Sequence, residues 1–489
     1  MTDCINHYLY GMKKIASHIT TFLMLSAAVS CIPKKEGSVY VPKDGDIKFT
    51  VLQTTQDHKL HPVKSTPFSK EGYTEIGYLD LDSACATHPY LGTGVSLTDA
   101  SCYLLSQMPP RKRKAFLKDA FTPTGMNLSM VRLNCGASDY ATELYNYNDV
   151  AGDVEMKHFS IDRDRLYMIP VIKEVLKVCP DLFVYSAVWS EPGWMKTSGA
   201  MCGGALLDEY LPAYANYVAA YLQAYKDAGV KIDAMSIHNE PLTDQNGGCP
   251  ASLVSEEQEI MLAGKLFPEA FRKAGVETKI WVHDYDYTYW ERVNRILADK
   301  DVNSNIDAVA WHPYGTGTPN LQKKVLAEHP GMPMHLTERG PNKLKADIQT
   351  RKWWCDVIFD ALRYGSSSYS SWNLLLDTDG QPLTGKYPCG GLEEIDLESG
   401  EIFGSTQADV FRQYCPYVKR GAEILEMESP DEDIASIAFR NPDGSYVVVI
   451  SSEDLHARKK YQIKFKDKYL AVSLPLGTWS MTTVLIENQ

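Results

Sequence analysis

Several patterns that would assign a chemistry directly are missing from this sequence of 489 residues. It has no C-x-x-C pair, so neither a zinc site nor a thiol redox site is supported. It also lacks the G-x-S-x-G motif of serine hydrolases and the complete G-x-x-x-x-G-K-S/T motif that binds nucleotide phosphates. No cofactor is implied, and the chemistry must come from ordinary side chains.

Positive charge is also scarce, because the formal net charge at pH 7 is −13. An acidic chain repels phosphate backbones, so nucleic acid is not an expected partner. The most apolar segment, residues 19–29, is shorter than the ~20 residues that a membrane-spanning helix needs. These features argue against a nucleic-acid-binding function and give no support to a membrane-spanning helix.

The N-terminus has the pattern of an export signal. Lys13 and Lys14 precede a mostly apolar stretch of small residues, 15–30, as in a secretory signal. We expect residues 1–31 to be this signal, with Met12 as the true start of translation.

The signal ends in Ala28-Val29-Ser30-Cys31, which resembles a bacterial lipobox. We expect Cys31 to be lipidated and residues 32–45 to be a tether. The protein would then be an exported periplasmic, outer-membrane or cell-surface lipoprotein of a bacterium. The alternative is ordinary secretion, with Cys31 incidental.

Short apolar runs alternate with helical patterns through the middle of the chain. Eight runs are typical of buried strands: 90–97, 128–135, 182–189, 232–238, 279–283, 306–312, 334–337 and 368–375. Helical periodicity fills 162–178, 207–228 and 254–274, and glycine follows the last two segments. Eight alternations predict a (β/α)₈ barrel over residues 85–390.

The two ends of the chain have a different character. Residues 446–451, 460–465 and 482–486 are rich in β-branched and aromatic residues, and Asn441-Pro442-Asp443-Gly444 predicts a turn. Residues 46–84 also look strand-like. We therefore expect an antiparallel β-sandwich built from 46–84 and 391–489.

Polar and aromatic side chains occur where the predicted barrel strands end, and that edge carries the active sites of such barrels. The fourth strand is followed by Asn239 and Glu240, and the seventh by Glu338. Glycoside cleavage needs one protonated carboxyl and one ionised carboxylate on opposite sides of the bond. Two glutamates on strands four and seven face each other across a barrel. The sequence thus predicts a glycosidase.

The barrel segment resembles glycoside hydrolase family 30, in the clan that has both glutamates on strands four and seven. The resemblance rests on three motifs: Gly92 to Ala100, which ends in Thr-Asp-Ala; Arg132 to Asp139; and Trp189-Ser-Glu-Pro-Gly-Trp-Met-Lys-Thr197. It implies a retaining β-glycosidase with Glu240 as acid/base and Glu338 as nucleophile.

The resemblance also implies a set of sugar-binding residues. Asn239 would bond the 2-hydroxyl, and Asp99 and Trp189 would hold the sugar at the cleaved end, called the glycone. Lining the same pocket we expect Arg132, His312, Tyr314 and Trp372. Family members also carry a β-sandwich built from both chain ends.

Departures from the family pattern concern the substrate. Glu191 replaces a usual proline, and residues 283–286 and Pro313 differ from the commonest forms. The Trp-Met-Lys-Thr segment favours a β-glucoside, cut as by glucosylceramidases or endo-β-1,6-glucanases. A member of the family active on xylan or β-xylosides is the alternative.

Two other functional classes are alternatives to a glycosidase. One is a metal-dependent barrel hydrolase with His283, Asp284, Asp286 and His312 as ligands, but it leaves both glutamates without a role. The other is a non-catalytic sugar-binding surface protein, which would not need to keep both glutamates.

Overall fold

The computed structural model describes residues 46–488 except 66, 73–77, 428–432, 454–459 and 476. The predicted signal (1–31, with Cys31) and tether (32–45) lie outside the described residues. Among the described residues, no helix is both long and apolar enough to cross a membrane.

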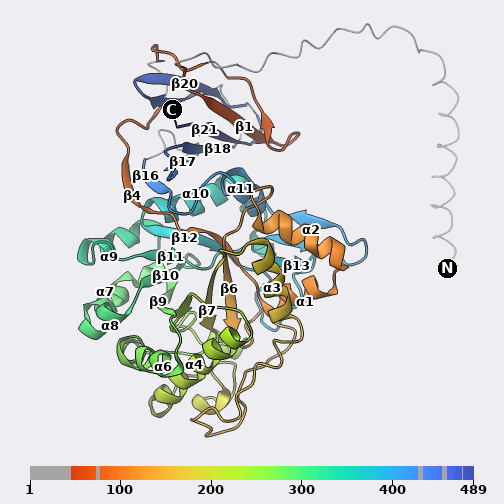
Figure 1. Ribbon diagram of the computed structural model, residues 1–489, viewed down its shortest axis with the longest axis vertical. Helices are drawn as coiled ribbons and strands as arrows, with labels where there is room; N and C mark the ends of the chain where they lie inside the picture. The colour runs from red at the N-terminus through yellow and green to blue at the C-terminus, as the bar shows by residue number, and fades with distance from the viewer. Residues whose placement is uncertain are drawn as a thin grey trace, which may run out of the picture. The chain divides into compact units, whose positions relative to one another are not determined.

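Eight parallel strands close into a barrel (Figure 1), in the order β10-β11-β12-β5-β6-β7-β8-β9. Their bounds are β5 Gly92–Ser96, β6 Met130–Cys135, β7 Phe183–Val188, β8 Ala234–Ser236, β9 Lys279–Asp286, β10 Ala308–His312, β11 Met334–Leu336 and β12 Ser366–Ser371. The predicted (β/α)₈ barrel is therefore confirmed, with each strand inside or overlapping its predicted segment.

Helices surround the barrel (Figure 1). They are α1 Asp99–Gln107, α2 Pro110–Phe121, α3 Met168–Val178, α4 Leu211–Asp227, α5 Glu256–Met261, α6 Phe267–Ala274, α7 Trp290–Ala298, α8 Lys300–Asn305, α9 Gln322–Glu328, α10 Arg351–Arg363 and α11 Thr406–Tyr414. Short one-turn helices are η1 Gly193–Met195, η2 Asp208–Tyr210, η3 Gln245–Gly247, η5 Tyr287–Tyr289, η6 Pro319–Leu321 and η7 Lys343–Lys345.

The helix predicted over 254–274 illustrates how local signals set these bounds. A capping box of Ser255 and Gln258 starts α5, because each side chain bonds the other's backbone N–H. A π-helical segment, η4 Leu262–Leu266, joins α5 to α6. Gly275 ends α6 in the left-handed conformation, at φ 68°.

A β-sandwich joins the two chain ends. One sheet has the order β2-β1-β21-β18-β17-β16-β4, and the other β20-β19-β3. The bounds are β1 Phe49–Thr55, β2 His61–Pro62, β3 Tyr78–Asp80, β4 Cys85–Pro89, β16 Glu423–Glu426, β17 Ile434–Arg440, β18 Tyr446–Ser452, β19 Lys460–Phe465, β20 Lys468–Ser473 and β21 Ser480–Ile486. Strand β1 pairs along its length with β21 (Figure 1), which confirms the predicted sandwich.

Strand pairing crosses the predicted domain boundaries. Strand β4, inside the segment 85–390 predicted as barrel, pairs with β16 of the sandwich. Strands β13 Leu375–Asp377, β14 Glu393–Ile395 and β15 Ile402–Gly404 form a separate sheet. The predicted eighth strand, 368–375, is broken because Asn373 takes a positive φ of 52°. Only its first half belongs to the barrel.

Candidate active site

A buried glutamate, Glu338, and a partly buried one, Glu240, meet where β8 and β11 end. One carboxylate oxygen of Glu240, one of Glu338 and one ring nitrogen of His312 all lie within 4.8 Å of one another. Inverting glycosidases hold their carboxyl groups ~6.5–9.5 Å apart to admit water, and retaining enzymes ~5–5.5 Å apart. The observed spacing is therefore that of a retaining pair.

Both glutamates line a cavity of about 530 Å³. A smaller recess of about 40 Å³ adjoins it and shares with it the lining residues Asp139, Glu240, Thr243, Gln245, Glu338 and Tyr387. The recess is bordered by the buried Trp189 and Asn239 and forms the closed side of the site, while the cavity is bordered by the exposed Tyr289 and forms its open side.

Arg132 on β6 differs from its prediction, because it lines neither the cavity nor the recess and instead connects polar groups of the site. Its guanidinium is fully buried, donates to Glu338, and donates to Asn239 Oδ1 at 2.8 Å and to Asp284 Oδ2 at 2.7 Å. Burial acts to raise the pKa of Asp284, but Arg132 and His312 hold it below its usual value. A buried charge is tolerated only when it is paired, so these groups fix one another.

Glu338 is the more enclosed of the two glutamates. Besides Arg132, it accepts a hydrogen bond of 3.0 Å from the Tyr314 hydroxyl. Burial raises the pKa of Glu338, while the charges of His312 and Arg132 and the hydroxyl of Tyr314 act to lower it. These three partners stabilise the ionised carboxylate.

Glu240 has different partners. Gln245 Nε2 donates to it at 2.9 Å, and His312 Nδ1 lies 3.1 Å from its other oxygen. The second ring nitrogen of His312 lies 3.1 Å from Asp284. Burial would lower the pKa of His312, but Glu338 and Asp284 raise it to about 9. A protonated His312 donates from both ring nitrogens.

Backbone strain gathers at the same strand ends. Glu240, His283, Asp284 and Asn373 have positive φ angles of 46°, 76°, 48° and 52°. Each such residue costs about 1–3 kcal/mol and persists only when its surroundings hold it there. Strain of this kind clusters at functional sites.

Most of the predicted sugar-binding residues are brought together. His312, Tyr314 and Trp372 line the cavity, and Trp189 and Asn239 line the recess. The Trp189 and Trp372 rings stack at 5.3 Å, and the Arg132 guanidinium lies 4.5 Å from the Trp189 ring centre.

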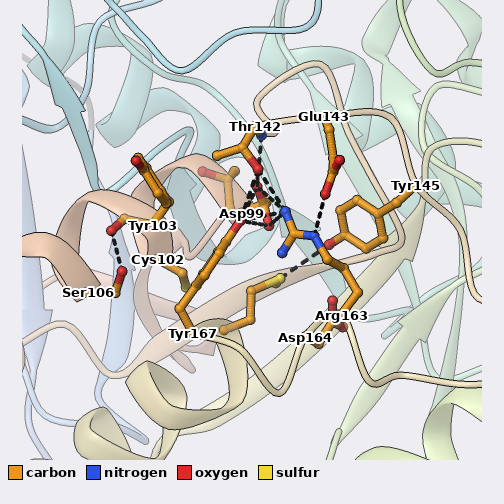
Figure 2. A network of polar contacts seen from close by, with 12 residues as sticks. Asp99, Cys102, Tyr103, Ser106, Thr142, Glu143, Tyr145, Arg163, Asp164 and Tyr167 are labelled. Atoms are coloured by element: carbon orange, nitrogen blue, oxygen red, sulfur yellow. Dashed lines mark hydrogen bonds and ion pairs between the residues drawn. The ribbon is translucent and has the colours of Figure 1, made fainter.

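Asp99 differs from its prediction. Its carboxylate is buried, lines neither space, and instead binds Thr142, Arg163 and Tyr167 (Figure 2). Asp99 opens helix α1, and its carboxylate binds the loop after β6 rather than the cavity. It is not placed to bind a sugar directly.

Asp139 is a carboxyl group of the site that sequence reasoning missed. It lines both the cavity and the recess, and burial together with Glu338 and Glu240 raises its pKa to about 8. The available signal was its position just after β6, on the barrel edge that carries the other site residues.

The open side of the cavity contains a second group that was not predicted. Tyr285 and Tyr289 stack with ring centres 5.5 Å apart and an interplanar angle of 20°. Around them, polar groups line the wall: Thr243, Gln245, Asp286, Thr288 and Thr316. This wall offers aromatic faces and hydrogen-bonding groups together.

The metal-binding alternative is not favoured by these contacts. Burial lowers the pKa of His283 to about 3, and its Nε2 lies 3.1 Å from the Asp286 carbonyl oxygen. Asp284 is occupied by Arg132, His312 and Thr337. Among the described residues, the donors with metal-compatible spacing are Glu240, His312 and Glu338, and of the four predicted ligands this set contains His312 alone.

Comparison with known proteins gives a consistent assignment. Residues 91–386 match the model of the glycosyl hydrolase family 30 TIM-barrel domain, and residues 421–484 match that of the family's beta sandwich domain.

Individual relatives point the same way. An endo-1,6-beta-D-glucanase of Neurospora crassa is 29% identical over 383 residues, which are 74% of this chain and 78% of the relative. A putative glucosylceramidase 1 of Caenorhabditis elegans is 25% identical over 80% of this chain and 79% of the relative. The solved structure of SrfJ from Salmonella typhimurium has a TM-score of 0.83 at 23% identity, covering 90% of this chain and 100% of that one.

The raised pKa of His312 is testable by NMR of the ring nitrogens in wild type and in Glu338→Gln. We expect His312 to titrate near pH 9 in wild type and at a clearly lower pH in the variant, because one stabilising negative charge is removed. The control Glu174→Gln removes a carboxylate that pairs with Arg113 and lines neither space, and should leave the titration unchanged.

A wild-type His312 that titrates near 6.5 would contradict this electrostatic description. The same shift affects stability. Because the folded-state pKa lies above the unfolded value, the stabilisation is complete below pH 6.5 and is lost as the pH rises through about 9.

Proposed function

We propose that Glu338 is the nucleophile and Glu240 the acid/base of this chain. The chain belongs to glycosyl hydrolase family 30 and hydrolyses β-glucosides. The spacing of the two carboxylates is the single observation that carries this proposal. The asymmetry of their partners supports the division of roles.

The nucleophile must be ionised at the start of the reaction. Arg132 and Tyr314 both donate to Glu338, and the cation of His312 lies nearby. In the first step a Glu338 oxygen attacks the anomeric carbon, and the bond from that carbon to the leaving oxygen breaks. Glu240 donates its proton to this oxygen, so the leaving group departs as a neutral alcohol.

The second step reverses the proton flow. Once Glu338 is esterified its charge is gone, and Glu240 takes a proton from an incoming water. The water oxygen bonds to the anomeric carbon, and the bond to Glu338 breaks. Two inversions leave the β configuration unchanged, and both carboxyl groups return to their starting states.

The sugar is held on the closed side of the site. Asn239, fixed by Arg132, is positioned to bond the 2-hydroxyl, and Trp189 and Trp372 offer apolar ring faces. Asp139, with a pKa of about 8, is a neutral carboxyl at pH 7. It can both donate to and accept from sugar hydroxyls.

We propose a β-1,6-linked glucan as the substrate. Beyond Glu240 the leaving group meets the Tyr285–Tyr289 stack and a wall rich in Thr, Gln and Asp side chains. A second pyranose suits aromatic faces edged by hydrogen-bonding groups, whereas the alkyl chains of a ceramide would desolvate these groups without replacing their hydrogen bonds. The endo-1,6-beta-D-glucanase relative agrees with this choice.

We also propose that the chain is anchored by a lipid on Cys31, on the basis of its lipobox-like segment alone. Labelled fatty acid should enter the full-length protein made in a bacterium and should be lost in Cys31→Ser. Equal labelling of both proteins, or labelling of neither, would refute the anchor and leave the enzymatic proposal intact.

The catalytic assignment predicts two different losses of activity. Glu338→Ala should lower kcat by about four orders of magnitude or more on every substrate, because the covalent route disappears. Glu240→Ala should slow substrates with poor leaving groups far more than activated aryl β-glucosides, since only the former need a proton. Steady-state kinetics on both substrate types measures this, with Glu174→Ala as the control.

Near-normal kcat in Glu338→Ala would remove the nucleophile assignment. An equal loss on both substrate types in Glu240→Ala would remove the acid/base assignment.

The substrate proposal predicts a selective effect of Tyr289→Ala. The kcat/KM for β-1,6-linked gluco-oligosaccharides should fall about tenfold, because one stacked ring contributes about 0.5–1.5 kcal/mol beyond its area. Hydrolysis of β-glucosyl fluoride, whose leaving group has no ring, should change less than about twofold. Tyr364→Ala, at a tyrosine that lines neither space, is the matched control.

Wild-type enzyme that cleaves glucosylceramide or xylan but no β-1,6-glucan would overturn the substrate and leave the mechanism in place. Binding of glucan without cleavage of any β-glucoside would instead support the non-catalytic alternative.

A further inference from the structure

A cluster of charged and hydroxyl groups around the buried Asp99 lies beside the site without touching the cavity (Figure 2). At its centre the Asp99 carboxylate accepts from Thr142 N at 2.8 Å, from Thr142 Oγ1 at 3.0 Å and from the Tyr167 hydroxyl at 2.8 Å. Arg163 Nη2 lies 3.2 Å from the same carboxylate. The reaction described above uses none of these groups.

The cluster holds the loop that carries Asp139. Thr142 follows Asp139 closely in the loop after β6, and both its backbone N–H and its hydroxyl donate to Asp99. Between them, the Tyr140 carbonyl accepts from the backbone N–H of Ala100, the neighbour of Asp99, at 3.1 Å. The first two residues of helix α1 therefore hold this loop by hydrogen bonds at Tyr140 and at Thr142.

The loop is held on its other side as well. The Asp139 carbonyl accepts from the backbone N–H groups of Thr384 and Gly385 at 2.8 and 3.0 Å. These bonds fix the backbone of Asp139 but leave its carboxyl free to face the cavity. The direction of the Asp139 carboxyl then depends on the next residues of the loop, 140–142, which are held by Asp99 and its neighbour Ala100.

Arg163 completes the arrangement from the far end of the same loop. It donates to Glu143 Oε1 at 2.8 Å and to Thr142 Oγ1 at 2.7 Å (Figure 2). Its guanidinium also lies over the rings of Tyr145 and Tyr167, at 4.7 and 4.8 Å. The Arg163 cation compensates the buried Asp99 charge and crosslinks the two ends of the loop.

A buried ion pair is a poor way to gain stability, because desolvation offsets much of the attraction. Its bonds are directional, however, and a site residue must be held to within about 0.5 Å. Resting on the proposed function, we propose that the Asp99–Arg163 pair is a positioning device for Asp139. It acts on sugar recognition through the Asp139 carboxyl and has no contact of its own with substrate.

A double-mutant cycle tests this coupling. The kcat and KM for an aryl β-glucoside would be measured in wild type, Asp99→Asn, Asp139→Ala and the double variant. Asp139→Ala should lower kcat/KM about tenfold or more, the size of a lost hydrogen bond to a strongly polar group. Asp99→Asn should give a loss of about tenfold in the wild-type background and less than about twofold in the Asp139→Ala background.

Two further variants guard against a simple folding defect. Arg163→Gln should reproduce the loss and the same dependence on Asp139, because it disturbs the loop from its other end. Arg113→Gln breaks a partly buried ion pair with Glu174 between α2 and α3 and should leave kcat/KM unchanged. If Asp99→Asn does not fold, Arg163→Gln and Thr142→Val, which removes one bond to Asp99, carry the test.

Equal losses from Asp99→Asn in both backgrounds would overturn the proposal, because Asp99 would then act independently of Asp139. If wild type cleaves no β-glucoside, the proposed function fails. The Kd of a glucose-configured iminosugar is then measured for the same four proteins in place of kcat/KM. Non-additive changes in that Kd would support the positioning role, and additive changes would overturn it.

Discussion

The contact between Arg132 and Glu338 is the interaction on which the rest of the site depends. The buried Arg132 guanidinium donates to Glu338, to Asn239 and to Asp284. We assign the first as the nucleophile and the second as the group that bonds the sugar's 2-hydroxyl. The guanidinium also lies against the Trp189 ring at one wall of the recess. Because an unpaired buried cation is strongly disfavoured, the positions of these groups are not independent.

Charge balance follows from this contact. Two cations, Arg132 and His312, face the carboxyl groups of Asp284, Glu240 and Glu338, and all of these side chains except that of Glu240 are buried. Another negative charge in the same space is unfavourable, so the pKa of Asp139 rises to about 8. Besides the catalytic pair, the site therefore contains a neutral carboxyl group that can both donate to and accept from sugar hydroxyls.

The barrel, the sandwich and the two glutamates could be predicted from the sequence, because each leaves a local or strongly periodic pattern in it. Sequence reasoning misplaced the role of Asp99, since the Thr-Asp-Ala motif shows that the position matters but not which way the side chain points. Asp139 was missed because its approach to the cavity depends on contacts with α1 and with residues 384–385, far apart in the chain. The Tyr285–Tyr289 stack depends on the end of β9 and on η5, whose geometry no residue pattern specifies. The broken eighth strand likewise follows from one left-handed residue, Asn373.

The most direct test of the central claim is to trap the covalent intermediate. In a 2-deoxy-2-fluoro-β-glucosyl fluoride, the fluorine at carbon 2 destabilises both cation-like transition states. The good leaving group speeds only the first step, so the covalent intermediate forms and then hydrolyses slowly. Peptide mass spectrometry of the treated protein should find one fluoroglucosyl group on the peptide that contains Glu338, and none in Glu338→Gln. Attachment to Glu240 or to any other residue would contradict the account.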